Sequence, residues 1–130
     1  MKRINVSSGS PWESLVGYSR AVRKGPFVFV SGTTASDEEG NVIGLGDSHA
    51  QAVLIFQKIA TALQKCGASL SDVVRTRMFV TNIKDWEAVG KAHADVLGDV
   101  QPTSTLVEVS KLVHPDLLVE IEVDAIVNEA

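Results

Sequence analysis

The residues best suited to proton chemistry are two carboxylates near the C-terminal end of the sequence. Glu120 and Glu122 are separated by one residue in an alternating stretch, so a strand there places both side chains on one face, roughly 7 Å apart. Arg75 and Arg77 show the same spacing in another apolar stretch. One interpretation is an ion-pair network between two strands. The other is a partly buried carboxylate that relays a proton to or from a bound molecule.

The histidines and the single cysteine form no metal or nucleophile motif. His49, His93 and His114 lie in three different predicted elements and have no metal-ligand spacing. Cys66 follows a predicted helix, at the end where the helix dipole disfavours a thiolate. His93 is interpreted as a partly buried, hydrogen-bonded histidine, with a place in a ligand cleft as the alternative. Residues 31–34, Ser-Gly-Thr-Thr, either end a strand or offer hydroxyls and backbone to a ligand. We therefore expect no metal and no cofactor.

Hydrophobic spacing predicts the elements that must position these residues. Apolar side chains at three- and four-residue steps predict a helix over residues 47–65, and Asp85 is expected to cap a second helix of about a dozen residues. Strands are predicted at residues 18–22, 26–31, 72–81, 103–109 and 117–127, the last from its clean alternation. The order β-β-α-β-α-β-β predicts one α+β domain over residues 1–130, with both helices on one face of a mixed sheet.

The second face of this sheet has no helix to cover it. By alternation it should carry Phe27 or Val28, Phe79, Leu106 and several carboxylates. A monomer seldom exposes a continuous apolar patch of that size. The sequence therefore predicts an oligomer in which another subunit covers this face.

Composition narrows the class of protein. The chain of 130 residues is 45% hydrophobic and 22% charged, which is typical of one globular domain. The net charge of −4 and the scattered lysines and arginines argue against a nucleic-acid-binding surface. No apolar run reaches the ~20 residues of a membrane span, and the first residues lack the apolar stretch of a secretory signal. With one cysteine, the expected compartment is the reducing cytoplasm.

Several of these segments resemble the RidA (YjgF, endoribonuclease L-PSP) family in order, over roughly the whole chain after residue 15. The matching segments are Tyr18, residues 28–32 (VFVSG), 67–70 (GASL), 73–82, 102–109 (PTSTLVEV) and 118–122 (LVEIE). The resemblance implies a chorismate-mutase-like fold and a homotrimer whose sheets pack around a central barrel. It also implies ligand clefts between subunits.

The resemblance implies an activity and a set of site residues. Members of the best-known branch hydrolyse enamines and imines, such as 2-aminoacrylate, to keto acids and ammonia without metal or cofactor. By matching positions, Tyr18 would wall the cleft, Gly32 would present backbone to the ligand, and Glu120 would orient or activate the water. Deaminase members carry an arginine two residues after the proline, where this chain has Ser104. A serine offers a hydrogen bond in place of a charged bidentate contact, so the 2-aminoacrylate activity does not carry over.

Arg77 is the candidate to replace that arginine as the contact for an anionic ligand, with Ser104 adding a hydroxyl. The alternative is that Arg77 pairs with Glu120, Glu122 or Glu108 inside the barrel.

Three functions remain open at this point. The first is a hydrolase, or deaminase, acting on a small imine or related metabolite between subunits. The second is a small-molecule-binding or regulatory trimer without turnover. The third is an endoribonuclease, which the acidic balance disfavours.

Overall fold

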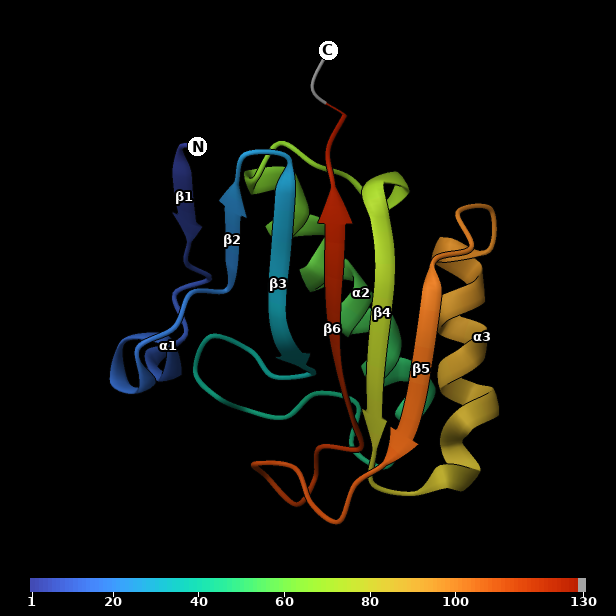
Figure 1. Ribbon diagram of the computed structural model, residues 1–130. Helices are drawn as coiled ribbons and strands as arrows, with labels where there is room; N and C mark the ends of the chain where they lie inside the picture. Colours follow the sequence, from blue (N-terminus) through green and yellow to red (C-terminus); the bar gives the residue numbers. More distant parts are fainter. Residues whose placement is uncertain (129–130) are drawn as a thin grey trace.

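A six-stranded mixed sheet forms the body of the protein, which the computed structural model describes over residues 1–128 (Figure 1). The strands are β1 (Arg3–Val6), β2 (Ala21–Lys24), β3 (Phe27–Thr34), β4 (Val73–Val80), β5 (Thr103–Glu108) and β6 (Val119–Ile126). Their order in the sheet is β1-β2-β3-β6-β4-β5. Neighbouring strands run antiparallel except β4 and β5, which are parallel. The last strand of the chain therefore lies in the middle of the sheet.

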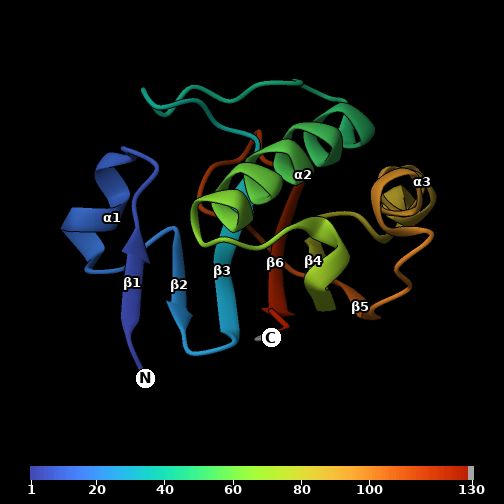
Figure 2. The ribbon, with the colours of Figure 1, turned by 90° about the horizontal axis from the view of Figure 1, so that it is seen from above.

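The two long helices, α2 (Ser48–Lys65) and α3 (Trp86–Leu97), cover one face of the sheet (Figure 2). The predicted limits of α2 are confirmed, because the Asp47 side chain accepts a hydrogen bond from the Ala50 N–H and Gly67 follows the helix with φ +76°. Single 3₁₀ turns, η1 (Leu70–Asp72) and η2 (Ile83–Asp85), precede β4 and α3. Asp85 makes no side-chain cap to α3, contrary to our expectation. Within residues 1–128, no helix has the length and hydropathy that crossing a membrane requires.

The α+β class with helices on one face is confirmed, and the structure adds two elements that precede the predicted ones. The short helix α1 (Pro11–Val16) and strand β1 lie at one side of the sheet. Only Val6 of β1 is buried, so this strand has no alternation to reveal it. The strand predicted at residues 18–22 is instead Ala21–Lys24, because β2 must pair with β3 across the Gly25-Pro26 turn.

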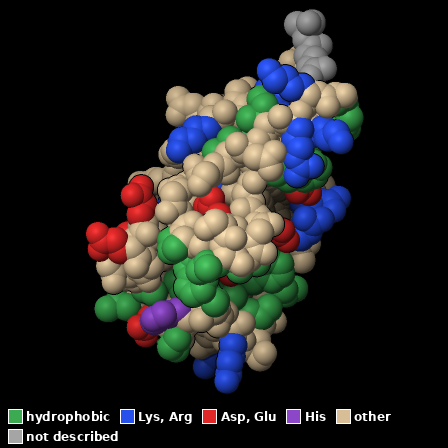
Figure 3. Space-filling model, turned by 90° about the vertical axis from the view of Figure 1, so that its left-hand side faces the viewer, with side chains coloured by type: hydrophobic (Ala, Val, Ile, Leu, Met, Phe, Trp, Pro, Cys, Tyr) green, Lys and Arg blue, Asp and Glu red, His purple; other side chains and the backbone are tan. Residues whose placement is uncertain are grey.

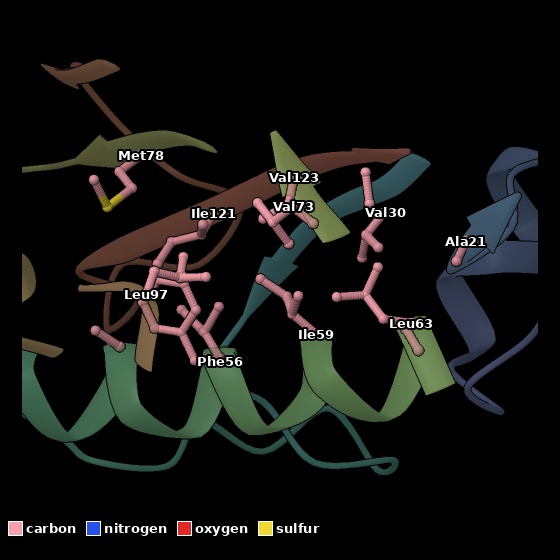
Figure 4. Close-up of a cluster of buried hydrophobic side chains, with 14 of the residues drawn as sticks. Ala21, Val30, Phe56, Ile59, Leu63, Val73, Met78, Leu97, Ile121 and Val123 are labelled. Carbon is pink, nitrogen blue, oxygen red and sulfur yellow. The ribbon is translucent and has the colours of Figure 1, made fainter. Parts of the chain in front are cut away.

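The core lies between α2, α3 and the sheet. Phe56, Ile59 and Leu63 of α2 point toward Val30, Ile121 and Val123 of the central strands (Figure 4). All six side chains are buried. Shortening such a residue to alanine typically costs about 2–5 kcal/mol of stability, so this layer holds β3 and β6 in place.

The face of the sheet away from the helices is open and carries apolar side chains. Phe27 and Phe29 of β3 are 42% and 51% exposed, whereas Val28 lies buried beneath the helices. On β5 the exposed residue is Val107, at 41%, and the expectation for Leu106 is wrong because its side chain packs against the core. Alternation places Leu106 and Val107 on opposite faces but does not say which of them faces the core; in the structure Leu106 pairs with the buried Met78 and Val107 with Phe79.

Candidate functional site

A cleft of about 1000 Å³ opens where β3 extends beyond its neighbour β2. The β2 pairing ends at Val30, and a bulge between Val30 and Thr33 shifts the register against β6. The cleft is lined by residues of α1, of the loop that follows β3, of α2 and of β6. Figure 3 shows this side of the molecule, where hydrophobic side chains gather in the lower half. Irregular strand ends of this kind commonly aim side chains into functional sites.

Glu120 lies in the wall of this cleft on β6, opposite Thr34 of β3. It is half-buried, and its carboxylate accepts no hydrogen bond from the side chains and backbone of residues 1–128. Burial raises the pKa of Glu120; the positive charge of Arg20 opposes this shift and the negative charge of Glu122 adds to it. Both carboxylate oxygens are thus uncommitted, in surroundings that favour proton exchange closer to neutral pH than usual.

Gly32 and Tyr18 also line the cleft, as the sequence predicted. A Cβ atom on residue 32 would overlap the Glu120 carboxylate, so the glycine is what allows that carboxylate its position. The Tyr18 ring forms part of the wall and is partly exposed. Three of the predicted site residues, Tyr18, Gly32 and Glu120, therefore come together in one place.

Arg20 belongs to the same cleft and was not predicted. Its guanidinium donates through Nη2 to the Gly32 carbonyl oxygen at 2.8 Å and lies 5.7 Å from the centroid of the Tyr18 ring. Its backbone bridges two segments, because its N–H donates to the Val6 carbonyl and its own carbonyl accepts from the Ser31 N–H. Alternation could not have found it, since β2 begins only at Ala21 and the partners of Arg20 come from β3.

Lys58 of α2 is the second cation of the cleft. Its Nζ donates to the carbonyl oxygens of Thr34 and Ser36 at 2.6 and 2.8 Å, which fastens the loop after β3 to the helix. Burial lowers the pKa of Lys58, and the nearby positive charge of Arg20 lowers it further. The sequence gave no signal for this role, because a lysine at the edge of the buried face of a helix commonly extends to solvent.

His93 and Ser104 meet elsewhere, between α3 and the β4–β5 pair. Thr76 donates to the Ser104 hydroxyl at 2.8 Å, and His93 Nε2 lies 2.9 Å from the same Thr76 oxygen. The edge of the His93 ring packs against Phe56, and burial lowers the pKa of the imidazole. This matches the interpretation of His93 as a partly buried, hydrogen-bonded histidine.

Arg77 lies on the open face of the sheet, where it pairs in register with Glu122, two residues from Glu120 on β6. Its Nη1 is 3.4 Å from Asp124 Oδ2 and 3.9 Å from Glu122 Oε1. Within the chain Arg77 and Ser104 cannot share a ligand, because Ser104 pairs in register with Thr76, whose side chain is on the opposite face. The ion-pair interpretation of Arg77 is therefore favoured, with Asp124 as a partner in addition to the predicted Glu122. Glu108 instead accepts the Ile83 N–H.

Two further groups bear on the chemistry. Over residues 1–128, no cluster of three or more His, Cys, Asp or Glu side chains has the arrangement of a metal site. Cys66 is buried, and burial raises the pKa of its thiol, which makes it a poor nucleophile.

The structure is thus an α+β domain with an uncommitted carboxylate in a cleft whose size is suited to a small molecule. The family model described as Endoribonuclease L-PSP matches residues 9–127. The chain belongs to this family, the RidA/YjgF family.

Relatives and solved structures agree with this assignment. The crystal structure of a YjgF/YER057c/UK114 family member from Mycobacterium tuberculosis is 50% identical, with a TM-score of 0.87 over 97% of this chain and 100% of that chain. The 3-aminoacrylate deaminase RutC of Acinetobacter baylyi is 32% identical over 120 residues, which are 92% of this chain and 94% of the relative. An uncharacterized protein of Streptomyces coelicolor is 38% identical over 121 residues, covering 92% and 89%.

Proposed function

We propose that the protein hydrolyses small enamines or imines to carbonyl compounds and ammonia, without metal or cofactor, at the cleft around Glu120. An enamine first takes a proton on carbon to become the imine. Water then adds to the imine carbon as its nitrogen takes a proton, and the C–N bond of the adduct breaks to release ammonia. The observation that carries the proposal is the Glu120 carboxylate, half-buried, uncommitted and facing a cleft. The relative named a 3-aminoacrylate deaminase supports the class of substrate.

Glu120 supplies the proton transfers in this scheme. As the carboxylate, it orients water and accepts its proton when the water attacks; as the acid, it returns a proton to the leaving nitrogen. Burial raises the pKa of Glu120, so the acid form persists to a higher pH than in an ordinary glutamate. The Tyr18 ring and the Gly32 backbone confine the substrate next to the carboxylate.

A direct test of the proposal mixes the protein with imines that an amino-acid oxidase generates in situ from amino acids with different side chains. Ammonia release, or decay of a trapped imine, should be faster with the protein than without it. A rate equal to the uncatalysed rate for every imine would contradict hydrolysis. Incubation with RNA in the same buffers checks the endoribonuclease alternative.

A second candidate function is ligand binding without turnover. The observation that favours it is Ser104, which stands where deaminase members carry arginine and whose hydroxyl is engaged by Thr76. Saturable binding of small carboxylates together with no acceleration of imine decay would support this function over hydrolysis.

We further propose a homotrimer in which the open sheet faces surround a central barrel and each cleft lies against a neighbouring subunit. The exposed Phe27, Phe29 and Val107 support it, since another copy would remove their side chains from water.

Sedimentation equilibrium is expected to give a trimer at micromolar concentration, and Arg77→Ala should weaken it. Loss of the guanidinium leaves Glu122 and Asp124, two like charges on the covered face, without their cation. The dissociation constant should rise, with the hydrolytic rate of the remaining trimer unchanged. Arg77→Lys, which keeps the charge, is the control. A monomeric wild-type protein would contradict the assembly, and an intact R77A trimer that no longer binds ligand would restore the anchoring role of Arg77.

A further inference from the structure

The Arg20 guanidinium is buried in the wall of the cleft with most of its hydrogen-bonding capacity unused. The residue is 7% exposed. An arginine has five N–H donors, and in this protein Nη2 donates to the Gly32 carbonyl while the buried Nε finds no acceptor in residues 1–128. Nη1 also donates to no group of residues 1–128 but, unlike Nε, is not closed off from solvent, so a molecule bound in the cleft can supply its acceptor.

No carboxylate of residues 1–128 forms an ion pair with this guanidinium. Glu13, the acid on the neighbouring helix α1, is committed to Ser8, whose backbone N–H and hydroxyl it accepts. Glu120 feels the charge of Arg20 but is not within ion-pair distance of it. Lys58 adds a second positive charge in the same cleft, and the two cations repel each other. An anion placed beside Arg20 would relieve this repulsion.

We propose that Arg20 binds the carboxylate of the cleft's ligand. The assignment of the cleft as the site rests on the proposed function. Arg20 and Glu120 both adjoin Gly32, the first through its hydrogen bond to the Gly32 carbonyl and the second across the open side of the glycine. In an α-imino acid the imine carbon is bonded directly to the carboxylate carbon. A carboxylate held by Arg20 therefore directs the carbon that water must attack toward Glu120.

The apolar residues of the cleft indicate what kind of side chain the ligand carries. Trp12 and Val16 of α1, Leu54 of α2, and Val113 line it, and Trp12 and Val113 are largely exposed to water. Covering such side chains with an apolar group is favourable. The ligand class is thus an α-imino acid with a sizeable apolar side chain, and its product is the corresponding 2-oxo acid.

Calorimetric titration with phenylpyruvate, the 2-oxo acid of this class, tests the assignment, with its methyl ester as the uncharged counterpart. Wild-type protein should bind the acid at least about tenfold more tightly than the ester, and Arg20→Gln should remove that preference by weakening the acid alone. Arg20→Lys should retain part of it. Lys91→Gln removes one positive charge from the exposed surface of α3 and should change neither affinity. Equal binding of acid and ester by the wild type, or an unchanged preference in R20Q, overturns the proposal.

A measurement on the wild type keeps the test decisive if R20Q does not fold. The Arg20 Nε–H resonance in a ¹H–¹⁵N spectrum, identified by its loss in R20K, should shift on addition of phenylpyruvate and stay in place with the ester. A resonance unmoved by saturating acid overturns the proposal. These readouts need no turnover: an Arg20-dependent acid preference without imine hydrolysis would leave this inference standing and remove the proposed hydrolase. Imine hydrolysis without an Arg20-dependent preference for the acid would support the hydrolase and overturn the assignment of Arg20.

Discussion

Glu120→Gln is expected to lower the rate of imine hydrolysis by a factor of about 10²–10⁴, the range for loss of a general acid–base group. The amide keeps the size of the side chain and can still touch water, but it can neither accept nor return a proton. Ammonia release under saturating substrate measures the loss, and sedimentation checks that the assembly is unchanged. Glu122→Gln is the matched control, because Glu122 lies two residues from Glu120 on the same face of β6 but its carboxylate lies beside Arg77. Full activity in E120Q would return Glu120 to a structural role.

The same residue gives the activity and the stability opposite dependences on pH. Glu120 must be ionised to accept a proton from water. The rate of hydrolysis should therefore fall as the pH drops through the pKa of Glu120, which burial raises above the usual value for a glutamate. For stability, a carboxyl whose folded pKa is raised stabilises the fold while protonated, and that contribution is lost as pH rises through the folded pKa. E120Q should therefore be at least as stable as wild type at neutral pH. Its free energy of unfolding should lack the decrease with rising pH that Glu120 causes in the wild type.

Gly32→Ala is expected to reduce hydrolysis about 10²-fold with little change in the free energy of unfolding. The new methyl group would occupy the space of the Glu120 carboxylate, which must rotate away from its position. Because the displaced atoms end a flexible side chain, the fold tolerates the change, whereas misplacing a catalytic group by about 1 Å costs a factor of this size. Thermal unfolding and ammonia release measure the two quantities.

A double-mutant cycle identifies the cause of the Gly32 effect. If the methyl group acts by displacing the carboxylate, G32A should add almost nothing to the loss already caused by E120Q. Additive losses from the two substitutions would mean that Gly32 contributes in another way, for instance by admitting the substrate to the backbone.

The elements with a regular hydrophobic period were predictable, and those that depend on long-range pairing were not. The three- and four-residue spacing of α2 and the alternation of β6 identified both elements from the residues alone. Strand β1 has four residues and one buried side chain, so only its pairing with β2 defines it. Helix α1 did carry a signal, Pro11 at its first position followed by Glu13 in its first turn, which are typical of a helix start.

The candidate site was predictable mainly through the resemblance to the RidA family, since its residues are far apart in the sequence. Tyr18, Gly32 and Glu120 were expected together and share the cleft. Within the chain the structure separates Arg77 from Ser104, because the register of β4 against β5 aligns Ser104 with Thr76, and a single sequence does not reveal register. Arg20 is significant only because Gly32 and Ser31, from the next strand, pack against it.

The central place of β6 has a consequence for how the chain acquires its structure. Its two partners in the sheet, β3 and β4, are joined to each other only through β6, which follows both of them in the sequence. Until β6 is in place, both strands present unpaired edges and half-covered apolar faces. Pairing between segments so far apart in sequence closes large loops, which makes folding slow. A chain in which β6 has not yet paired is therefore prone to aggregation, and removal of β6 would split the sheet in two.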